Sequence, residues 1–163
     1  MTNRDGPRAR DTAGGYGVGM GSPADLEKLL DLAPFARTIG MRLISADRHE
    51  VVGALDWSAG LCTAGGVLHG GALMALADTA GALCAFLNLP EGAATSTIES
   101  KTNFFRAITR GQVRAVARPL HVGGRTIVVR TELSDESGRP AAHVVQTQAV
   151  LGPAPERQEP VHP

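Results

Sequence analysis

Hydrophobic and polar residues alternate in several short segments of the chain, and this alternation predicts a mainly β structure. Turn-forming residues, among them "TRG", "VGG" and "DESG", separate the later segments. In the segment 125–134, every second residue from 127 to 133 is on the same side of the predicted strand. The predicted strands are 41–46, 51–57, 95–106, 112–120, 125–134 and 139–151.

One long segment is apolar on every side and predicts a helix instead. It is "LHGGALMALADTAGALCAF", residues 68–86, and its only charged residue is Asp78. Such a helix is expected to be buried, and its many Gly and Ala residues suit close packing under a sheet. The order of elements therefore predicts an α+β fold, with a curved antiparallel sheet wrapped around one long central helix.

The length of this apolar helix also raises a membrane span, which the central Asp78 and the flanking strands disfavour. A shorter helix is predicted near the start, with Ser22 as its cap and Pro23 at its first position. "PFARTIG" then leads into the first strand.

Composition predicts one folded domain at residues 23–152. Residues 1–22 are rich in Gly, Arg and Asp and predict a flexible leader, and the Pro-rich residues 153–163 predict a flexible tail.

The formal net charge is zero, so no basic surplus indicates nucleic acid as a partner. Two cysteines without a metal-ligand pattern disfavour a zinc site. Without a signal-peptide pattern, a cytoplasmic location is expected.

Asp78 needs an explanation, because an ionised carboxylate in an apolar helix costs several kcal/mol unless it is paired or reaches water. No Lys or Arg occurs between residues 61 and 100. Asp78 could pair with a strand residue such as Lys101 or Arg106. Alternatively, the helix lines a cleft in which Asp78 acts as a base or nucleophile. For Glu99 a surface position is favoured over a place beside Asp78.

Glycines lie directly before the helix, in "GGVLHGG". The free N–H groups and the dipole of a helix start favour negative charge, so the Gly70 N–H is a natural oxyanion donor. Gly70 and Asp78 are eight residues apart, or about 12 Å along a helix. A nucleophile must approach its carbon within about 3–3.5 Å. If both residues act on one carbonyl, they come from two subunits.

Three stretches resemble the PaaI-type hotdog-fold acyl-CoA thioesterases. They are "TAGGVLHGGALMALADTAGALCAF", "TSTIESKTNFFRAITRGQVRA" and "GGRTIVVRTELSDESGRPAAHVVQTQAVL", and the resemblance covers about residues 38–151. It implies a homodimer or homotetramer with the active site at the subunit interface. It also implies an acyl-CoA substrate, with no cofactor and no metal.

The resemblance assigns four catalytic positions. Asp78 matches the nucleophile or general base, and the Gly70 N–H matches the group that polarises the thioester carbonyl. His69 matches the histidine that supports the loop and the pocket. Thr97 matches a Ser or Thr that holds the water or the acid.

Four further residues are expected to bind substrate. Gly71 belongs to the same glycine motif, and Thr63 stands where many members have Asn or Gln. In the turn "HVGGR", Gly124 and Arg125 offer backbone amides and a cation to a phosphate of CoA.

The implied activity is hydrolysis of an aryl- or medium-chain acyl-CoA to the free acid and CoA. The sequence leaves open whether Asp78 attacks directly or activates water. Because Thr63 lacks an amide, the alternative is a non-catalytic acyl-CoA-binding or sensing protein on the same fold. A hydratase of this fold would need a differently spaced His and acid pair, which the sequence lacks.

Overall fold

The structure is a computed structural model that describes residues 22–152. Apart from Ser22, the predicted leader and tail lie outside the described residues. The elements, in chain order, are α1 (Pro23–Leu30), α2 (Pro34–Thr38), β1 (Arg42–Ala46), β2 (Val51–Asp56), α3 (Gly70–Phe86), β3 (Ala94–Phe104), β4 (Gln112–Val122), β5 (Thr126–Ser134) and β6 (Pro140–Leu151). Two short 3-10 turns, Ala59–Leu61 and Ala64–Gly66, lie between β2 and α3.

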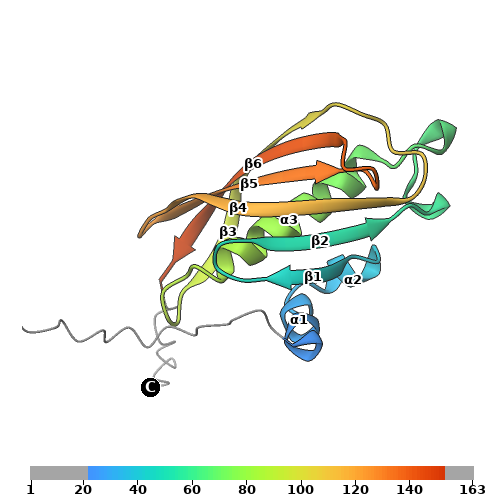
Figure 1. Cartoon of the computed structure of the whole chain (residues 1–163). Helices are drawn as coiled ribbons and strands as arrows, with labels where there is room; N and C mark the ends of the chain where they lie inside the picture. The colour runs from blue at the N-terminus through green and yellow to red at the C-terminus, as the bar shows by residue number, and fades with distance from the viewer. Residues whose placement is uncertain (1–21, 153–163) are drawn as a thin grey trace, which may run out of the picture.

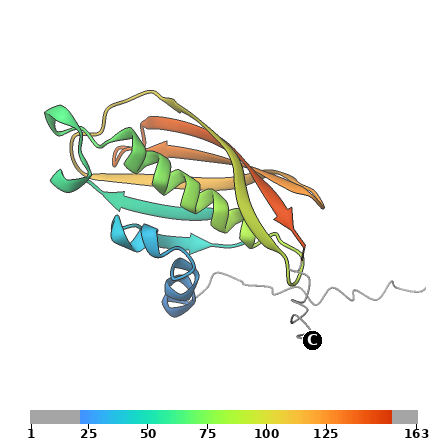
Figure 2. The ribbon, with the colours of Figure 1, turned by 180° about the vertical axis from the view of Figure 1, so that it is seen from behind.

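The six strands form one antiparallel sheet in the order β1-β2-β4-β5-β6-β3. The sheet curves around α3, which crosses its inner face diagonally (Figures 1 and 2). The predicted sheet around one long helix is therefore confirmed. β3 is an edge strand, because among residues 22–152 only β6 pairs with it.

The core forms between α3 and the inner face of the sheet. Alternate residues of β4 and β5 point inward and are buried, as the period of two in a strand requires. Gly53 of β2 leaves room for the side chain of Met41, because a Cβ there would lie 2.6 Å from the Met41 Cε. The buried side of α3 consists of Leu73, Leu76, Ala77, Ala80, Gly81, Leu83, Cys84 and Ala85.

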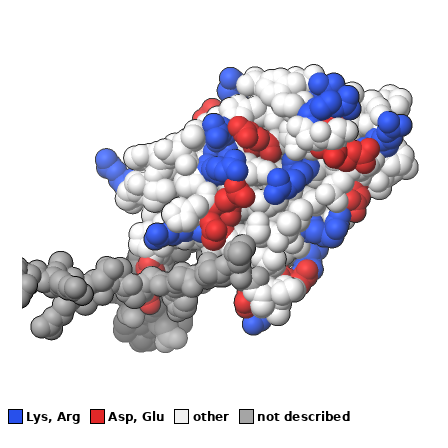
Figure 3. All heavy atoms as spheres, in the orientation of Figure 1, with Lys and Arg blue, Asp and Glu red and all other residues white. Residues whose placement is uncertain are grey.

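The outer face of the sheet carries mixed charges. Lys and Arg alternate there with Asp and Glu over the strands (Figure 3). Arg42 of β1 donates two hydrogen bonds to Asp56 of β2, at 2.8 and 2.9 Å. Arg118 of β4 forms an ion pair with Glu50. The charged side chains of the strands therefore lie mainly on the face of the sheet opposite α3.

The predicted elements agree with the observed ones to within three residues at each end. α1 begins after Ser22 as predicted, with the Ser22 hydroxyl donating to the Asp25 carboxylate at 2.8 Å. The prediction omitted α2, a helix of one turn that begins at Pro34. Among residues 22–152, no helix combines the length and the apolar composition that crossing a membrane requires.

Candidate functional site

Asp78 lies near the middle of α3, on a side of the helix that β3 and β6 cover only in part. Residues four apart share a face of a helix, and Met74, Asp78, Ala82 and Phe86 form a line that we call the α3 stripe. Met74 and Phe86 are each 41% exposed, and Asp78 is half-buried. The expectation that α3 is buried on all sides is wrong along this stripe, because β3 and β6 contact Asp78 but leave Met74 and Phe86 exposed.

Thr97 of β3 contacts the carboxylate directly. Its Oγ1 donates a hydrogen bond to Oδ1 of Asp78 at 3.1 Å. The structure thus brings together two predicted site residues that lie 19 positions apart. Within residues 22–152, no Lys or Arg forms an ion pair with Asp78, so pairing with Lys101 or Arg106 is not observed. Hydrogen-bond donors, rather than a cation, surround the carboxylate.

Two glutamines of β6 complete this environment, and the sequence analysis missed both. Nε2 of Gln146 donates to the Asp78 backbone carbonyl at 3.2 Å and approaches Oδ1 at 3.5 Å. Nε2 of Gln148 donates to Thr97 Oγ1 at 2.8 Å. Both glutamines are 0% exposed. The available signal was "VVQTQAV", in which two amides alternate on the buried side of a strand and therefore need partners.

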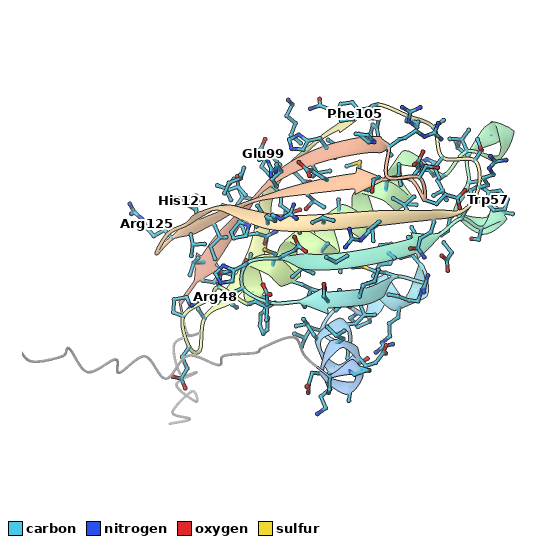
Figure 4. The ribbon with its side chains drawn as sticks, viewed as in Figure 1. Arg48, Trp57, Glu99, Phe105, His121 and Arg125 are labelled. Carbon is cyan, nitrogen blue, oxygen red and sulfur yellow. The ribbon has the colours of Figure 1, made fainter. Side chains whose placement is uncertain are left out.

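A β-bulge decides which residues of β3 face Asp78. The pairing of β3 with β6 shifts between Thr97 and Glu99, so Ile98 is the extra residue. Thr97 lies opposite Gln148 and faces α3, whereas Glu99 lies opposite Thr147 and faces outward. Without the bulge, residues 97 and 99 would share a face. The surface position favoured for Glu99 is confirmed (Figure 4).

The start of α3 carries the predicted HGG motif. Nδ1 of His69 accepts a hydrogen bond from the Gly71 N–H at 2.8 Å and caps the helix. Gly70 is the first helical residue, so its N–H has no partner within the helix. A Cβ on Gly70 would lie 3.2 Å from Cζ of Phe104, which shows that this ring packs against the glycine. The helix start therefore offers a free amide beside an aromatic ring.

The loop before α3 is tied to the end of β2. The indole Nε1 of Trp57 donates to the carbonyl of Gly66 at 2.9 Å. The Thr63 N–H donates to the carbonyl of Val67 at 2.8 Å and closes the turn. Gly65 and Gly66 have φ values of +79° and +71°, which favour glycine. These contacts position Thr63 at the surface of the loop.

Two hollows lie on either side of the helix start. The α2 hollow has a volume of about 360 Å³ and lies between α2 and α3. Its lining is mostly apolar and includes Phe35, Ile39, Leu61, Ala72 and Ala75, with His69 and Gly71 at one side. The Phe104 hollow has a volume of about 410 Å³ and is lined by Thr63, Gly70, Leu73, Phe104, Phe105 and Arg106, among others. The predicted residues Thr63 and Gly70 thus share one hollow.

Other predicted site residues are not brought together within one chain. Gly70 and Asp78 lie on one continuous helix, so the spacing of about 12 Å along the axis holds. Gly124 and Arg125 belong to the turn between β4 and β5. This turn is at one end of the sheet, and Trp57 and the start of α3 are at the other (Figure 4).

Neither cysteine belongs to a metal-binding cluster in the part of the chain that the structure describes. Burial raises the pKa of the Cys84 thiol to about 12, and the negative charge of Asp47 adds to this effect. Cys62 is half-buried, and its Sγ donates to the carbonyl of Ser58 at 3.2 Å. Cys84 is therefore a neutral packing residue at neutral pH.

The glycine loop, α3 and the following strands also match known proteins. The family model of the thioesterase superfamily matches residues 65–142. The proofreading thioesterase EntH of Cronobacter sakazakii is 37% identical over 87 residues, which are 53% of this chain and 64% of that protein. The 1,4-dihydroxy-2-naphthoyl-CoA hydrolase of Escherichia coli is 36% identical over 86 residues, which are 53% of this chain and 63% of that protein. Residues 65–142 of the chain therefore match the thioesterase superfamily.

Solved structures extend the similarity over most of the length of the chain. The thioesterase PA1618 of Pseudomonas aeruginosa, in a mutant form, superposes with a TM-score of 0.74 and 27% identity, over 81% of this chain and 97% of that one. The conserved protein PA5202 of the same organism gives a TM-score of 0.69 and 33% identity, over 73% and 94%. The predicted hotdog fold is confirmed. With the two sequence relatives above, the chain matches less than two-thirds of their length.

The segment that carries the superfamily match includes His69, Gly70, Asp78 and Thr97. It ends before the two buried glutamines, Gln146 and Gln148. The donors around Asp78 therefore come partly from the matched segment and partly from the portion of β6 beyond residue 142.

Proposed function

We propose that this protein hydrolyses an aryl- or medium-chain acyl-CoA thioester to the free acid and CoA. The observation that carries the proposal is the setting of Asp78 on an open apolar stripe. Thr97 donates to its Oδ1, whereas within residues 22–152 no hydrogen bond reaches Oδ2. A carboxylate with one bound and one free oxygen is oriented and still able to react. Relatives named as a thioesterase and a CoA hydrolase support a thioester as the target.

In the proposed reaction, the Gly70 N–H donates a hydrogen bond to the thioester carbonyl oxygen as negative charge develops there. The dipole of α3 favours the same charge. Asp78 either attacks the carbonyl carbon, forming an anhydride that water cleaves, or takes a proton from the attacking water. In both versions the C–S bond breaks and CoA leaves as its thiol. His69 holds the helix start in place through Gly71.

One complete site is proposed to need two copies of the chain, because Gly70 and Asp78 are about 12 Å apart on one helix. The surface supports self-association. The free edge of β3 lies beside the α3 stripe, as the contact between Thr97 and Asp78 requires. Ile98 and Phe105 along this edge are 63% and 60% exposed. A homodimer, or a homotetramer built from two dimers, would cover these apolar side chains.

The hollows near the start of α3 support the proposed substrate class. Ligand pockets commonly have volumes of about 300–1,000 Å³ and are mostly apolar. The α2 hollow, lined by residues such as Phe35 and Ile39, suits an uncharged ring or a medium-length chain. Thr63 and Gly71 are proposed to contact the substrate at the two sides of Gly70. Gly124 and Arg125 are proposed to bind a CoA phosphate from the β4–β5 turn.

The test is release of the CoA thiol from phenylacetyl-, hydroxybenzoyl-, short- and medium-chain acyl-CoAs. Asp78→Asn should lower kcat by about 10²–10⁴-fold, the usual contribution of a general base. Circular dichroism and light scattering should show an unchanged fold and oligomer. Equal rates in both proteins would make Asp78 structural. Binding of acyl-CoA by the wild type without turnover of any substrate would support the non-catalytic alternative.

A further inference from the structure

Four side chains form a continuous chain of hydrogen bonds that ends at Asp78. Thr95 Oγ1 contacts Gln148 Oε1 at 3.0 Å, and Gln148 Nε2 contacts Thr97 Oγ1 at 2.8 Å. Thr97 Oγ1 then contacts Asp78 Oδ1 at 3.1 Å. Three of the four residues come from the edge strand β3 and its neighbour β6, so the sheet aligns the chain of contacts under α3.

The direction of these hydrogen bonds follows from the chemistry of each group. An amide nitrogen only donates, so Gln148 Nε2 occupies a lone pair of the Thr97 hydroxyl. The hydroxyl proton of Thr97 is then directed to Asp78. A proton donated to a carboxylate stabilises its ionised form. The Thr95 hydroxyl lies 3.0 Å from both Gln148 Oε1 and the Ala149 carbonyl oxygen, and its single proton can be donated to either acceptor.

Gln146 of β6 contacts α3 at Asp78 and Gly81. It donates to the backbone carbonyl of Asp78 at 3.2 Å and lies within 3.5 Å of Oδ1. Its amide occupies the space next to Gly81, where a Cβ would overlap all three amide heavy atoms. The absence of a side chain at residue 81 therefore lets Gln146 reach Asp78.

Within the described residues, no other titratable group of the sheet faces Asp78. The inner sides of the strands carry apolar residues, Ser, Thr and Gln. The pairing registers put the charged and titratable side chains of β2 to β6 on the outer face; these are Asp56, Glu99, Lys101, Arg114, Arg118, His121, Arg130, Glu132 and His143. On α2, Arg37 is exposed and paired with Glu27 and Asp31. On α3 itself, Cys84 is neutral below a pKa of about 12, and His69 caps the helix start.

We propose that Gln146 and Gln148 are positioning residues for Asp78, which act through its backbone carbonyl and through Thr97. They direct a proton donor at Oδ1 and leave Oδ2 as the oxygen that attacks the thioester or accepts a proton from water. This inference rests on the proposed function only in the step that Oδ2 performs. The hydrogen bond from Thr97 to Oδ1 is independent of turnover.

The first test is Gln148→Glu, which keeps the shape of the side chain. The change replaces a donor with a carboxyl group and adds negative charge near Asp78, and both effects disfavour the Asp78 carboxylate. The acidic limb of the kcat/KM profile should therefore move to higher pH by about one unit or more. Gln148→Met removes the donor without adding charge and should lower kcat with a much smaller movement of the limb.

The matched control is Gln112→Glu. Gln112 donates from Nε2 to the carboxylate of Asp56 at 3.0 Å, on the outer face of the sheet. The acidic limb should stay at the wild-type pH in this variant. An unchanged limb in a folded Gln148→Glu protein would overturn the proposal.

A second measurement separates this inference from the proposed function. The carboxyl carbon of Asp78 can be titrated by NMR, with Asp78→Asn to assign its signal. Its midpoint should be higher in Gln148→Glu than in the wild type, even if the wild type hydrolyses no thioester. Equal midpoints would overturn the inference.

If Gln148→Glu does not fold, Thr97→Val and Thr97→Ser replace it. Only the valine, which lacks the hydroxyl, should raise the midpoint, and equal midpoints would again overturn the inference.

Discussion

At the scale of single residues, Asp78 shows how an apolar helix tolerates a carboxylate without a cation. The side chain is half-buried, and its donors are a hydroxyl and an amide from two strands of the sheet. Pairing with Lys or Arg would satisfy the charge equally well, but it would also neutralise it. Neutral donors leave the negative charge available at Oδ2, which is what a nucleophile or base needs.

Gly81 provides a test of how closely Gln146 packs against α3. In an ordinary helix, Gly→Ala stabilises by about 1 kcal/mol. Here the new methyl group would overlap the Gln146 amide, and overpacking costs about 1–3 kcal/mol. Gly81→Ala should therefore lower the free energy of unfolding, measured by urea denaturation, and should also reduce turnover.

The double variant gives the contrast. In a Gln146→Ala background the space is empty, so Gly81→Ala should raise the free energy of unfolding instead. An effect of the same sign in both backgrounds would contradict the packing described here.

At the scale of elements, alternation and apolar length predicted α3 and all six strands, because burial on one face imposes a period that a sequence displays. α2 was missed because one helical turn is too short to show a period. The bulge at Ile98 was missed for a different reason. It is defined by the pairing of β3 with β6, and pairing partners are not visible in one strand's own sequence.

The candidate site likewise contains residues that the sequence indicated and residues that only the tertiary fold brings in. Asp78 and Gly70 could be proposed from the sequence because they lie on one helix, whereas the role of His69 came from the family resemblance. The hydrogen bond from Thr97 was anticipated only through the family resemblance. Gln146 could not be predicted, because its contact with α3 joins residues 68 positions apart through the tertiary fold.

The buried side of α3 predicts a loss of stability in alkali. The pKa of the Cys84 thiol is raised from 9.0 to about 12. Above pH 9 the unfolded chain releases this proton while the folded chain keeps it. The contribution is therefore complete below pH 9 and falls by about 1.4 kcal/mol per pH unit up to about pH 12.

Urea unfolding of the wild type and Cys84→Ala, below pH 9 and at about pH 10, measures this term. The difference in free energy between the two proteins should shrink at the higher pH. A difference that does not change with pH would show that Cys84 ionises equally in both states.

At the scale of the whole molecule, the α3 stripe and the free edge of β3 form one surface that is apolar around a single carboxylate. Phe86, at the end of the stripe, is 41% exposed in the chain. Phe86→Lys should place a charge in the proposed interface between copies. We expect sedimentation velocity to show a smaller assembly, and turnover to fall in proportion to the fraction dissociated.

Leu32→Lys is the matched control. Leu32 is 59% exposed but lies between α1 and α2, away from the α3 stripe. It should leave both the assembly and the turnover unchanged. Full activity of a monomeric Phe86→Lys protein would mean that one chain contains a complete site.

The hydrogen bond from Trp57 to the Gly66 carbonyl also has a consequence for the fluorescence of the protein. Trp57 is the only tryptophan in the sequence, so selectively excited indole fluorescence comes from one known place. That indole holds the loop that carries Thr63 beside Gly70. Any ligand that displaces this loop changes the polarity around the indole and therefore its emission. The protein thus contains its own unlabelled reporter for occupancy of the helix start, whether or not the bound compound is hydrolysed.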